Sequence, residues 1–560
     1  MVSFRMSQRQ PCRAACTAAR GIARLTLSLG LFLVPAAVNA QARLDLEGFI
    51  EVGGEAERYL RVLQIAGLVP LTPWSIQPFT PTQASAFRAP NPNPWSARLN
   101  PATGFALARG VELLRPKGRV IGNSSFPFQD GPGPTWAGRG LTAEVQAGVA
   151  ASWGMISAQV APLAFIAQNA SFELANNGAS DGQQYGDARF PLGIDAPQRF
   201  GASAYEHLLP GTSFLTIDTR FLVASLTSAA QQWGPARDYP LVLGPNAGGF
   251  PSLYIGTSRP FDLWLFKVHA RAVYGELTQS AFSLEVDGQR RRFASGLVTV
   301  ITPRGVPGLE LGGGRFIHQT WPNGGLTLAS FRRPLSAGLN ITRLADNPAN
   351  ENQVASLFAR WAFPSAGVEV YGEMYREDYP GQFHYAPSLV EKPDDLASFT
   401  IGLQRVFSIG SQRARVVRAE LVNGETSHQE RGTRGFAVPI PPYTHGRVTQ
   451  GHTLNGLLLG SPEAYGGAAW RLGLDEYTPA GRQSVSLERS LRFDWLPTRT
   501  DATQVRPDVV YAVRLERLRF HGRSDYSFAL IPAVDLNRNL VAGRNVFNLT
   551  AVITMRGWAY

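Results

Sequence analysis

The stretch Trp-Leu-Phe-Lys-Val-His-Ala-Arg-Ala-Val-Tyr at residues 264–274 alternates between two kinds of side chain. One face carries Trp264, Phe266, Val268, Ala270, Ala272 and Tyr274, and the centre of the other carries Lys267, His269 and Arg271. Strict alternation predicts a β-strand. About eleven residues with aromatic ends match a tilted strand that crosses a bilayer. We therefore expect one face of this strand in lipid and the other in a polar interior.

The same alternation recurs along the chain, in residues 355–363, 485–495 and 547–555. Residues 141–160 also alternate, and the apolar face changes parity across Trp153-Gly154, which predicts a hairpin. This hairpin lies in the longest uncharged stretch, between Glu144 and Glu173. That stretch is long enough for a transmembrane helix, but its polar residues and proline would be poorly tolerated in lipid. We therefore expect no membrane-spanning helix there.

The composition agrees with a barrel that has one face in lipid. The 560 residues are 44% hydrophobic and only 17% charged, whereas about a quarter of residues are charged in soluble domains. A soluble sandwich or propeller also has alternating strands, but those strands are usually about 5–6 residues long. The longer strands with aromatic ends therefore predict a mainly β fold, a large closed antiparallel transmembrane β-barrel of about 16–18 strands.

Residues 1–40 have the pattern of a cleaved signal peptide. Five arginines and no acidic residue precede an apolar run at Leu25–Val34, and Val38-Asn39-Ala40 offers a cleavage site. An uncleaved anchor is the alternative, but the apolar run is short of the roughly 20 residues of a span. Cleavage would remove both cysteines, Cys12 and Cys16, and lower the formal net charge from +11 to +6. Disulfides and thiol chemistry are then excluded.

Residues 41–117 are expected to form a small N-terminal helical bundle, a periplasmic cap or plug. Residues 55–66 are helix formers with an apolar face, and Gly67 is a natural stop. Thr80-Pro81-Thr82-Gln83 has the form of a capping box. A third helix is expected from Asn100-Pro101, with Leu107, Val111 and Leu114 on one face. The barrel is then expected over residues 118–560.

Four blocks of sequence stand out, in chain order: Leu71–Trp74, Gln231–Pro235 continuing to Leu241–Pro251, Val368–Glu373, and Tyr443–His445 with Thr449–Thr453. Together they resemble the Wzi-like capsule-assembly family of outer-membrane β-barrel proteins. Gly248 and Gly249 stand where the family pattern has Arg and Pro. Any role of that arginine in polysaccharide contact therefore does not carry over to this chain.

The resemblance implies a non-enzymatic lectin of the outer membrane that anchors capsular or exopolysaccharide at the cell surface. Its expected partners are that polysaccharide, outer-membrane lipid and the polysaccharide-export machinery. Aromatic faces and carboxylates suit sugar binding, and they give as polysaccharide-binding or lumen candidates Trp233, Asn246, Glu369, Tyr371, Glu373, Tyr375, Glu377, Tyr443 and His445.

Structural roles are the alternative for each of these candidates. The carboxylates can fill the lumen by pairing with inward arginines such as Arg360 or Arg376. Trp233 and Asn246 can belong to a rigid turn, and His445 and His452 can serve as structural hydrogen-bonding groups.

Catalysis, metals and cofactors are not expected. The sequence has no H-E-x-x-H motif and no P-loop, and its eight histidines have no ligand spacing. The basic residues are spread along the chain, so we expect no nucleic-acid partner. Two other functions remain open. One is an outer-membrane channel for small polar solutes, and the other is an outer-membrane enzyme that uses His445 or a lumen carboxylate.

Overall fold

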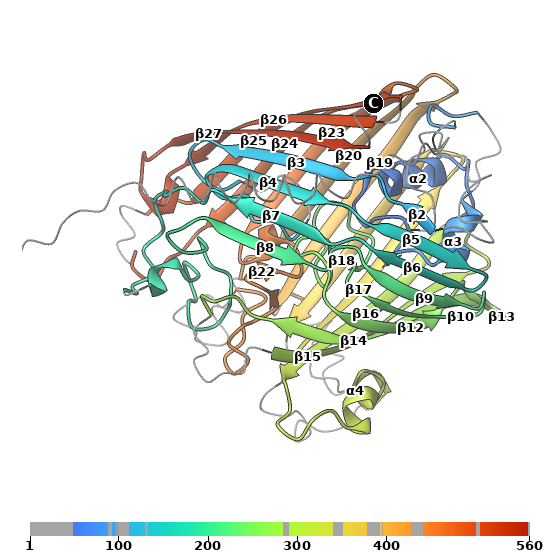
Figure 1. The fold of residues 1–560 in the computed structure, drawn as a ribbon, viewed down its shortest axis with the longest axis horizontal. Helices are drawn as coiled ribbons and strands as arrows, with labels where there is room; N and C mark the ends of the chain where they lie inside the picture. The colour runs from blue at the N-terminus through green and yellow to red at the C-terminus, as the bar shows by residue number, and fades with distance from the viewer. Residues whose placement is uncertain are drawn as a thin grey trace, which may run out of the picture. The chain divides into compact units, whose positions relative to one another are not determined.

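The computed structural model of the chain is a β-barrel whose lumen contains inward-folded segments of the same chain (Figure 1). It describes residues 49–87, 92–96, 98, 111–128, 133–180, 182–283, 291–339, 351–377, 393–394, 396–426, 441–499, 505–522 and 524–557. The signal peptide expected over residues 1–40 lies outside these ranges. Within them, no helix has both the length and the apolar character needed to cross a membrane.

The wall of the barrel is antiparallel throughout. Its strands are β2 (Val111–Leu113), β3 (Lys117–Asn123), β4 (Gly140–Gln146), β5 (Val149–Trp153), β6 (Ile156–Val160), β7 (Leu163–Ala167), β8 (Tyr205–Leu209), β9 (Phe214–Asp218), β10 (Leu222–Thr227), β12 (Ser252–Thr257), β13 (Phe261–Leu263), β14 (Phe266–Thr278), β15 (Arg291–Pro303), β16 (Leu309–Thr320), β17 (Glu351–Phe363), β18 (Val368–Glu377), β19 (Ala397–Ile409), β20 (Ala414–Asn423), β23 (Ala468–Thr478), β24 (Gly481–Phe493), β25 (Asp508–His521), β26 (Ser524–Leu536) and β27 (Val546–Arg556).

The ladder of paired strands closes on itself. The last strand pairs with the first long one, Thr550 with Asn123 and Arg556 with Lys117. Five pairs of the 23 strands are halves of one interrupted strand: β2/β3, β4/β5, β6/β7, β8/β9 and β12/β13. The described residues therefore form 18 wall strands, five of them interrupted, which is within the expected range.

The barrel has two unlike ends. Short turns join the strands at one end, at 154–155, 219–221, 264–265, 304–308, 364–367, 410–413, 479–480 and 522–523. The other end carries long connections, among them 168–204, 228–251, 321–350 and 424–467. We call these the short-turn end and the long-loop end. Figure 1 shows the N-terminal helices at the short-turn end.

Side chains alternate between the two faces of the wall as the sequence predicts. In β14, His269 and Arg271 are buried in the interior, and Val268, Ala270 and Ala272 lie on the outer face. In β27, Asn548 and Thr550 point inward, and Phe547, Leu549 and Ile553 are exposed outside. The predicted hairpin is β5–β6, with Trp153 opposite Ile156 and Gly154 at φ +61°. The expectation of alternating strands is confirmed.

Two of the three expected N-terminal helices are present in the described residues. They are α2 (Glu55–Ile65) and α3 (Pro81–Ala86), and α3 begins at the predicted capping box, in which Thr80 and Gln83 bond to each other's backbone. The third expected helix is wrong in the part that the structure describes. Residues 100–110 lie outside the described ranges, and Val111–Leu113 is strand β2, paired with β5. The wall therefore begins at Val111, earlier than the expected boundary at residue 117.

Two layers of inward-folded chain fill the lumen. At the short-turn end, α2 and the following segment pack with wall residues in one apolar cluster: Tyr59, Leu60, Trp74, Phe79, Phe87, Trp95, Val406, Val416, Tyr477 and Leu518. Towards the long-loop end, segments 228–251 and 441–467 form a second cluster with the wall: Trp233, Tyr239, Leu241, Leu243, Tyr443, Leu454, Leu459, Val298, Phe316 and Tyr375.

The inner segments carry short elements of their own. These are β1 (Ile76–Gln77), which pairs with β11 (Gln232–Trp233), the hairpin β21 (Thr453–Leu454) with β22 (Leu457–Leu458), and the 3-10 turn η5 (Pro462–Ala464). The β1–β11 pair joins the two layers. The long connections carry the turns η2 (Gln183–Tyr185) and η6 (Arg538–Leu540) and helix α4 (Leu328–Leu339).

Candidate functional site

The five candidates on β18 all point into the barrel and are all buried: Glu369, Tyr371, Glu373, Tyr375 and Glu377. Glu369 receives Nη2 of Arg61 from α2 at 3.0 Å and forms an ion pair with Arg360 of β17. Gln404 donates a further hydrogen bond to it at 2.9 Å. The carboxylate of Glu369 therefore holds the N-terminal helix to the wall, and its predicted alternative role, pairing with Arg360, is confirmed.

Glu377 and Tyr375 hold the second inner segment. The Tyr375 hydroxyl donates to the Glu377 carboxylate, and the backbone N–H of Tyr443 donates to the same oxygen at 2.9 Å. Tyr443 has φ +74°, and its hydroxyl donates to the carbonyl of Leu241 at 2.9 Å. Tyr443 therefore links segments 441–467 and 228–251 to β18.

A carboxylate that we did not select from the sequence, Glu420 of β20, holds segment 228–251. It accepts the backbone N–H groups of Arg237, Asp238 and Tyr239 at 3.0, 3.0 and 2.6 Å. The Tyr371 hydroxyl also donates to it. The alternation of residues 414–423 places Glu420 on the inward face, but the sequence does not indicate its partners.

Glu310 of β16 plays the same part at the short-turn end. It accepts the backbone N–H groups of Trp74 and Ser75 at 3.0 and 3.2 Å and the Ser75 hydroxyl at 2.8 Å. Three inward carboxylates of the wall (Glu310, Glu377 and Glu420) thus bind main-chain N–H groups of three inward-folded segments.

Trp233 is completely buried and packs edge-on against Phe316, with ring centroids 5.8 Å apart. Two wall glycines make room for its indole. A Cβ on Gly296 would lie 2.5 Å from Cη2 of Trp233, and one on Gly314 would lie 3.1 Å from Cε3. Next to it, Gly234 has φ +94°, and the buried carboxylate of Glu373 lies against it. Trp233 and Glu373 are thus packing residues of the inner layer, not exposed sugar contacts.

The two histidines of the second inner segment make structural hydrogen bonds. His445 is half-buried, and its Nδ1 accepts the N–H groups of Arg447 and Val448 at 3.2 and 2.8 Å. His452 is buried, and its Nε2 donates to the carbonyl of Val242 at 2.7 Å. Burial, together with the nearby charge of Arg292, lowers the pKa of His452 to about 4.

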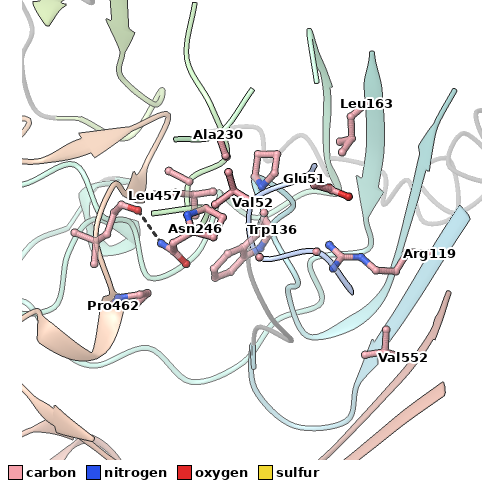
Figure 2. Close-up of a pocket in the computed structure, with 18 of the residues that line it drawn as sticks. Glu51, Val52, Arg119, Trp136, Leu163, Ala230, Asn246, Leu457, Pro462 and Val552 are labelled. Atoms are coloured by element: carbon pink, nitrogen blue, oxygen red, sulfur yellow. Dashed lines mark hydrogen bonds between the residues drawn. The ribbon is translucent and has the colours of Figure 1, made fainter. Parts of the chain in front are cut away.

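A cavity of about 660 Å³ lies between the two inner layers and the wall (Figure 2). Of the nine sequence candidates, only Asn246 lines it, and its Nδ2 donates to the carbonyl of Leu458 at 2.7 Å. Six aromatic residues also line the cavity: Phe49, Phe126, Phe128, Trp136, Phe200 and Tyr205. In the view of Figure 2, Trp136 lies between Asn246 on one side and Glu51 and Arg119 on the other.

Charged side chains give the cavity a basic excess. Its lining has ten arginine and lysine residues (Arg58, Lys117, Arg119, Arg237, Arg418, Arg471, Arg482, Arg492, Arg514 and Arg556) and seven acids (Glu51, Glu55, Asp238, Glu463, Glu488, Glu516 and Asp525). Lys117 and Arg556 lower the pKa of Glu51 to about 2. Burial alone would raise the pKa of Asp238, but Arg418 and Arg471, at 3.0 and 2.9 Å, hold it below its usual range.

One acid of the lining, Glu463, has a pKa that is raised and not lowered. Burial, together with the nearby charge of Glu488, raises the pKa of Glu463 above its usual range, although the Ser461 hydroxyl donates to it at 2.5 Å. A raised pKa disfavours the charged carboxylate.

One sequence motif of serine hydrolases occurs in the chain, at Gly178–Gly182. In those enzymes the serine sits on a sharp turn between a strand and a helix. Here the motif lies in the long connection between β7 and β8, before the single turn η2. Among the described residues, no group of three His, Cys, Asp or Glu side chains is arranged to hold a metal ion.

The residues that the sequence analysis missed come from loops distant in the sequence. Trp136 lies in the Pro/Gly-rich connection after β3, the same kind of signal that pointed to Trp233. Glu463 and Leu457 come from segment 441–467, and Glu51 precedes α2. Only the closed barrel brings these residues around one cavity.

Comparison with known proteins finds similar structures but no matching sequence family. No family model matches the chain, and no curated protein matches its sequence. Among solved structures, it is similar to Wzi of Escherichia coli, described as an outer membrane protein involved in group 1 capsule assembly and a carbohydrate-binding β-barrel. The TM-score is 0.60 at 13% identity, over 90% of this chain and 99% of that one.

Two further solved structures, both of Pseudomonas aeruginosa proteins, are more distant. They are OpdQ (TM-score 0.36, 7% identity, 80% of this chain and 98% of that one) and OprD (TM-score 0.36, 11% identity, 80% and 95%). Its own closed ladder of strands and the likeness to Wzi give the chain the fold of a large transmembrane β-barrel.

Proposed function

We propose that this chain is a non-enzymatic, Wzi-like protein of the outer membrane that binds capsular or exopolysaccharide and holds it at the cell surface. The observation that carries the proposal is the filled lumen, in which wall carboxylates fasten three inward-folded segments around one closed core. Such an interior suits a binding protein better than a conduit. The likeness to a carbohydrate-binding barrel supports the same reading.

The cavity between the layers is the proposed saccharide site. Aromatic rings such as Trp136 offer faces for sugar C–H groups, and Asn246 and Ser461 offer groups for hydroxyls. The excess of arginine and lysine in the lining favours a glycan that carries acidic groups. In this proposal, the short-turn end with α2 faces the periplasm and the long loops face the cell exterior.

Binding of surface polysaccharide to the purified protein tests the proposal. Trp136→Ala should weaken binding about fivefold, the loss expected for one aromatic contact. Trp264→Ala is the matched control, because Trp264 is the exposed residue of a short turn and does not line the cavity. Deletion of the gene should release capsule from the cells. The proposal fails if no surface glycan binds and the capsule stays attached.

A channel for small polar solutes is the second candidate function. It is favoured by the charged residues that continue along the cavity wall on neighbouring strands, namely Arg482, Glu488 and Arg492 on β24 and Arg514 and Glu516 on β25. Conductance in planar bilayers separates the two functions. A sustained ion current would support the channel and contradict a plugged lectin.

A further inference from the structure

Helix α4 lies on the outer face of the barrel wall, at its long-loop end (Figure 1). The Tyr274 hydroxyl donates to the carbonyl of Phe331 at 2.9 Å, and the Phe331 ring lies 5.3 Å from Tyr274 and 5.8 Å from Phe293. Phe293 and Ile317 have the parity of the outer face, yet they are only 4% and 1% exposed. Residues that would otherwise face the surroundings are therefore covered by α4.

The height of α4 along the wall is fixed by Tyr274. The outer face of β14 runs from Phe266 through Val268, Ala270 and Ala272 to Tyr274. Eight residues of a strand tilted by about 40° rise roughly 20 Å along the membrane normal, close to the height of the apolar band of such barrels. Tyr274 and α4 thus lie at the membrane interface of the leaflet around the long-loop end.

Helix α4 also carries an exposed apolar stripe, in which Phe331 both touches the wall and stays partly exposed. Leu328, Phe331 and Leu335 follow one another at helical spacing and are 64%, 38% and 46% exposed. Arg333 pairs with Glu351 of β17 at 2.8 Å. Arg332 is exposed beside the apolar stripe, and among the described residues no acidic side chain lies within ion-pair distance of it. The described part of the helix therefore presents an apolar stripe beside the exposed guanidinium of Arg332.

We propose that α4 is embedded in the interface of this leaflet and binds an anionic lipid. Leu328, Phe331 and Leu335 contact acyl chains, and the Arg332 guanidinium binds the phosphate of a lipid headgroup. The outer face of the wall between α4 and the short-turn end is apolar as well, because Leu311 of β16 and Leu357 of β17 are exposed there. Three side chains are far too few for a stable interface between two copies of the chain, which buries about 1,200–2,000 Å².

The depth of α4 is tested with nitroxide labels on the full chain in vesicles of phosphatidylcholine and phosphatidylglycerol. Leu335→Cys and the control Gly324→Cys are labelled in a background with Cys12 and Cys16 replaced by serine. We expect the label at 335 to be more accessible to oxygen than to a water-soluble nickel chelate, and the label at 324 to show the reverse. Greater nickel access at 335, or shielding from both reagents, would overturn the embedding.

The headgroup contact is tested by native mass spectrometry of the phosphatidylglycerol that the protein retains after extraction in detergent. Arg332→Gln should lower retention about fivefold, the effect of one interfacial cation. Arg304→Gln is the control, because Arg304 is exposed at the short-turn end and paired with Asp262. Equal retention by both variants would overturn the contact. Neither readout involves a glycan, so the outcome is independent of the proposed function.

Discussion

Arg61 of α2 and Glu369 of β18, 308 positions apart in the chain, form a buried ion pair with Nη2 3.0 Å from Oε1. Arg61 Nη2 also donates to the carbonyl of Pro235 at 2.7 Å. One side chain therefore connects the N-terminal helix, the barrel wall and the first inner segment.

Replacing Arg61 by methionine should destabilise the plugged barrel by about 3–5 kcal/mol, because the partner carboxylate loses part of its compensation in a buried site. Thermal unfolding in detergent measures the change. Arg304→Met provides the comparison, since exposed pairs contribute about 0–1 kcal/mol. Similar losses in the two variants would contradict the anchoring role of Arg61.

Glu420→Gln should loosen residues 237–239 while the wall stays folded. An amide offers one acceptor oxygen, and its NH₂ group would face the N–H donors that the carboxylate now accepts. The loss should be about 2–3 kcal/mol, as for hydrogen bonds to a charged group. Amide hydrogen exchange of residues 237–239 reports it directly. Glu476→Gln, on the outer face of the neighbouring strand, should leave that exchange unchanged.

Gly296→Ala should destabilise the inner layer by about 1–3 kcal/mol, because the new methyl group would lie 2.5 Å from the Trp233 ring. Gly118→Ala is a matched change in β3 with no atom within 4 Å of the new methyl group. Equilibrium unfolding compares the two. Combining Gly296→Ala with Trp233→Leu should recover part of the loss, and a strictly additive double variant would argue against the contact.

Acidification should weaken the second inner segment through His452. The pKa of this buried imidazole is about 4 in the fold, against 6.5 when exposed. The unfolded state therefore binds a proton first, and stability falls as the pH drops from about 6.5 to about 4, by up to about 3 kcal/mol. A proton there would also place a second positive charge near Arg292, which donates to the carbonyls of Gly451 and Thr453 at 2.6 Å.

Hydrogen exchange of residues 441–467 at pH 7 and pH 5 measures this effect. His452→Gln keeps a donor for the carbonyl of Val242 but has no proton to gain, so its exchange should depend less on pH. Both proteins contain the same other titratable residues, so the pH dependence that those residues cause cancels in the comparison. An unchanged pH dependence in the variant would remove His452 as the cause.

The wall could be predicted from the sequence because each strand carries its own evidence. Most of the stretch 264–274 alternates along β14, although Trp264 and Leu265 form the turn before that strand. The capping box at Thr80 marks a helix start within four residues. The third expected helix failed because its evidence was ambiguous. Val111 and Leu114 fit a helical face, but Val111 and Leu113 fit the outer face of a strand equally well, and pairing with β5 decided the outcome.

The site was much less predictable. Alternation shows that Glu369 points inward, but not that Arg61, far away in the chain, will pair with it. A carboxylate that anchors a buried segment and one that binds a ligand lie on the same face of a strand and are the same residue type, so the sequence does not distinguish them. The cavity lining joins Glu51, Trp136, Asn246 and Glu463 from four separate segments, and their proximity is a property of barrel closure. No local sequence pattern indicates this proximity.

The fastening of the inner segments by Glu310, Glu377 and Glu420 depends on main-chain N–H groups. Every amino acid except proline supplies that group. The N–H contacts of residues 237–239 would therefore survive any substitution there except proline, whereas the buried Asp238 and Tyr239 also hold the segment through their own side chains. Wherever a segment is held by its main chain alone, such a barrel can diversify the surfaces it offers to a ligand while its closure is inherited unchanged, so stability and recognition can evolve separately in one small interior.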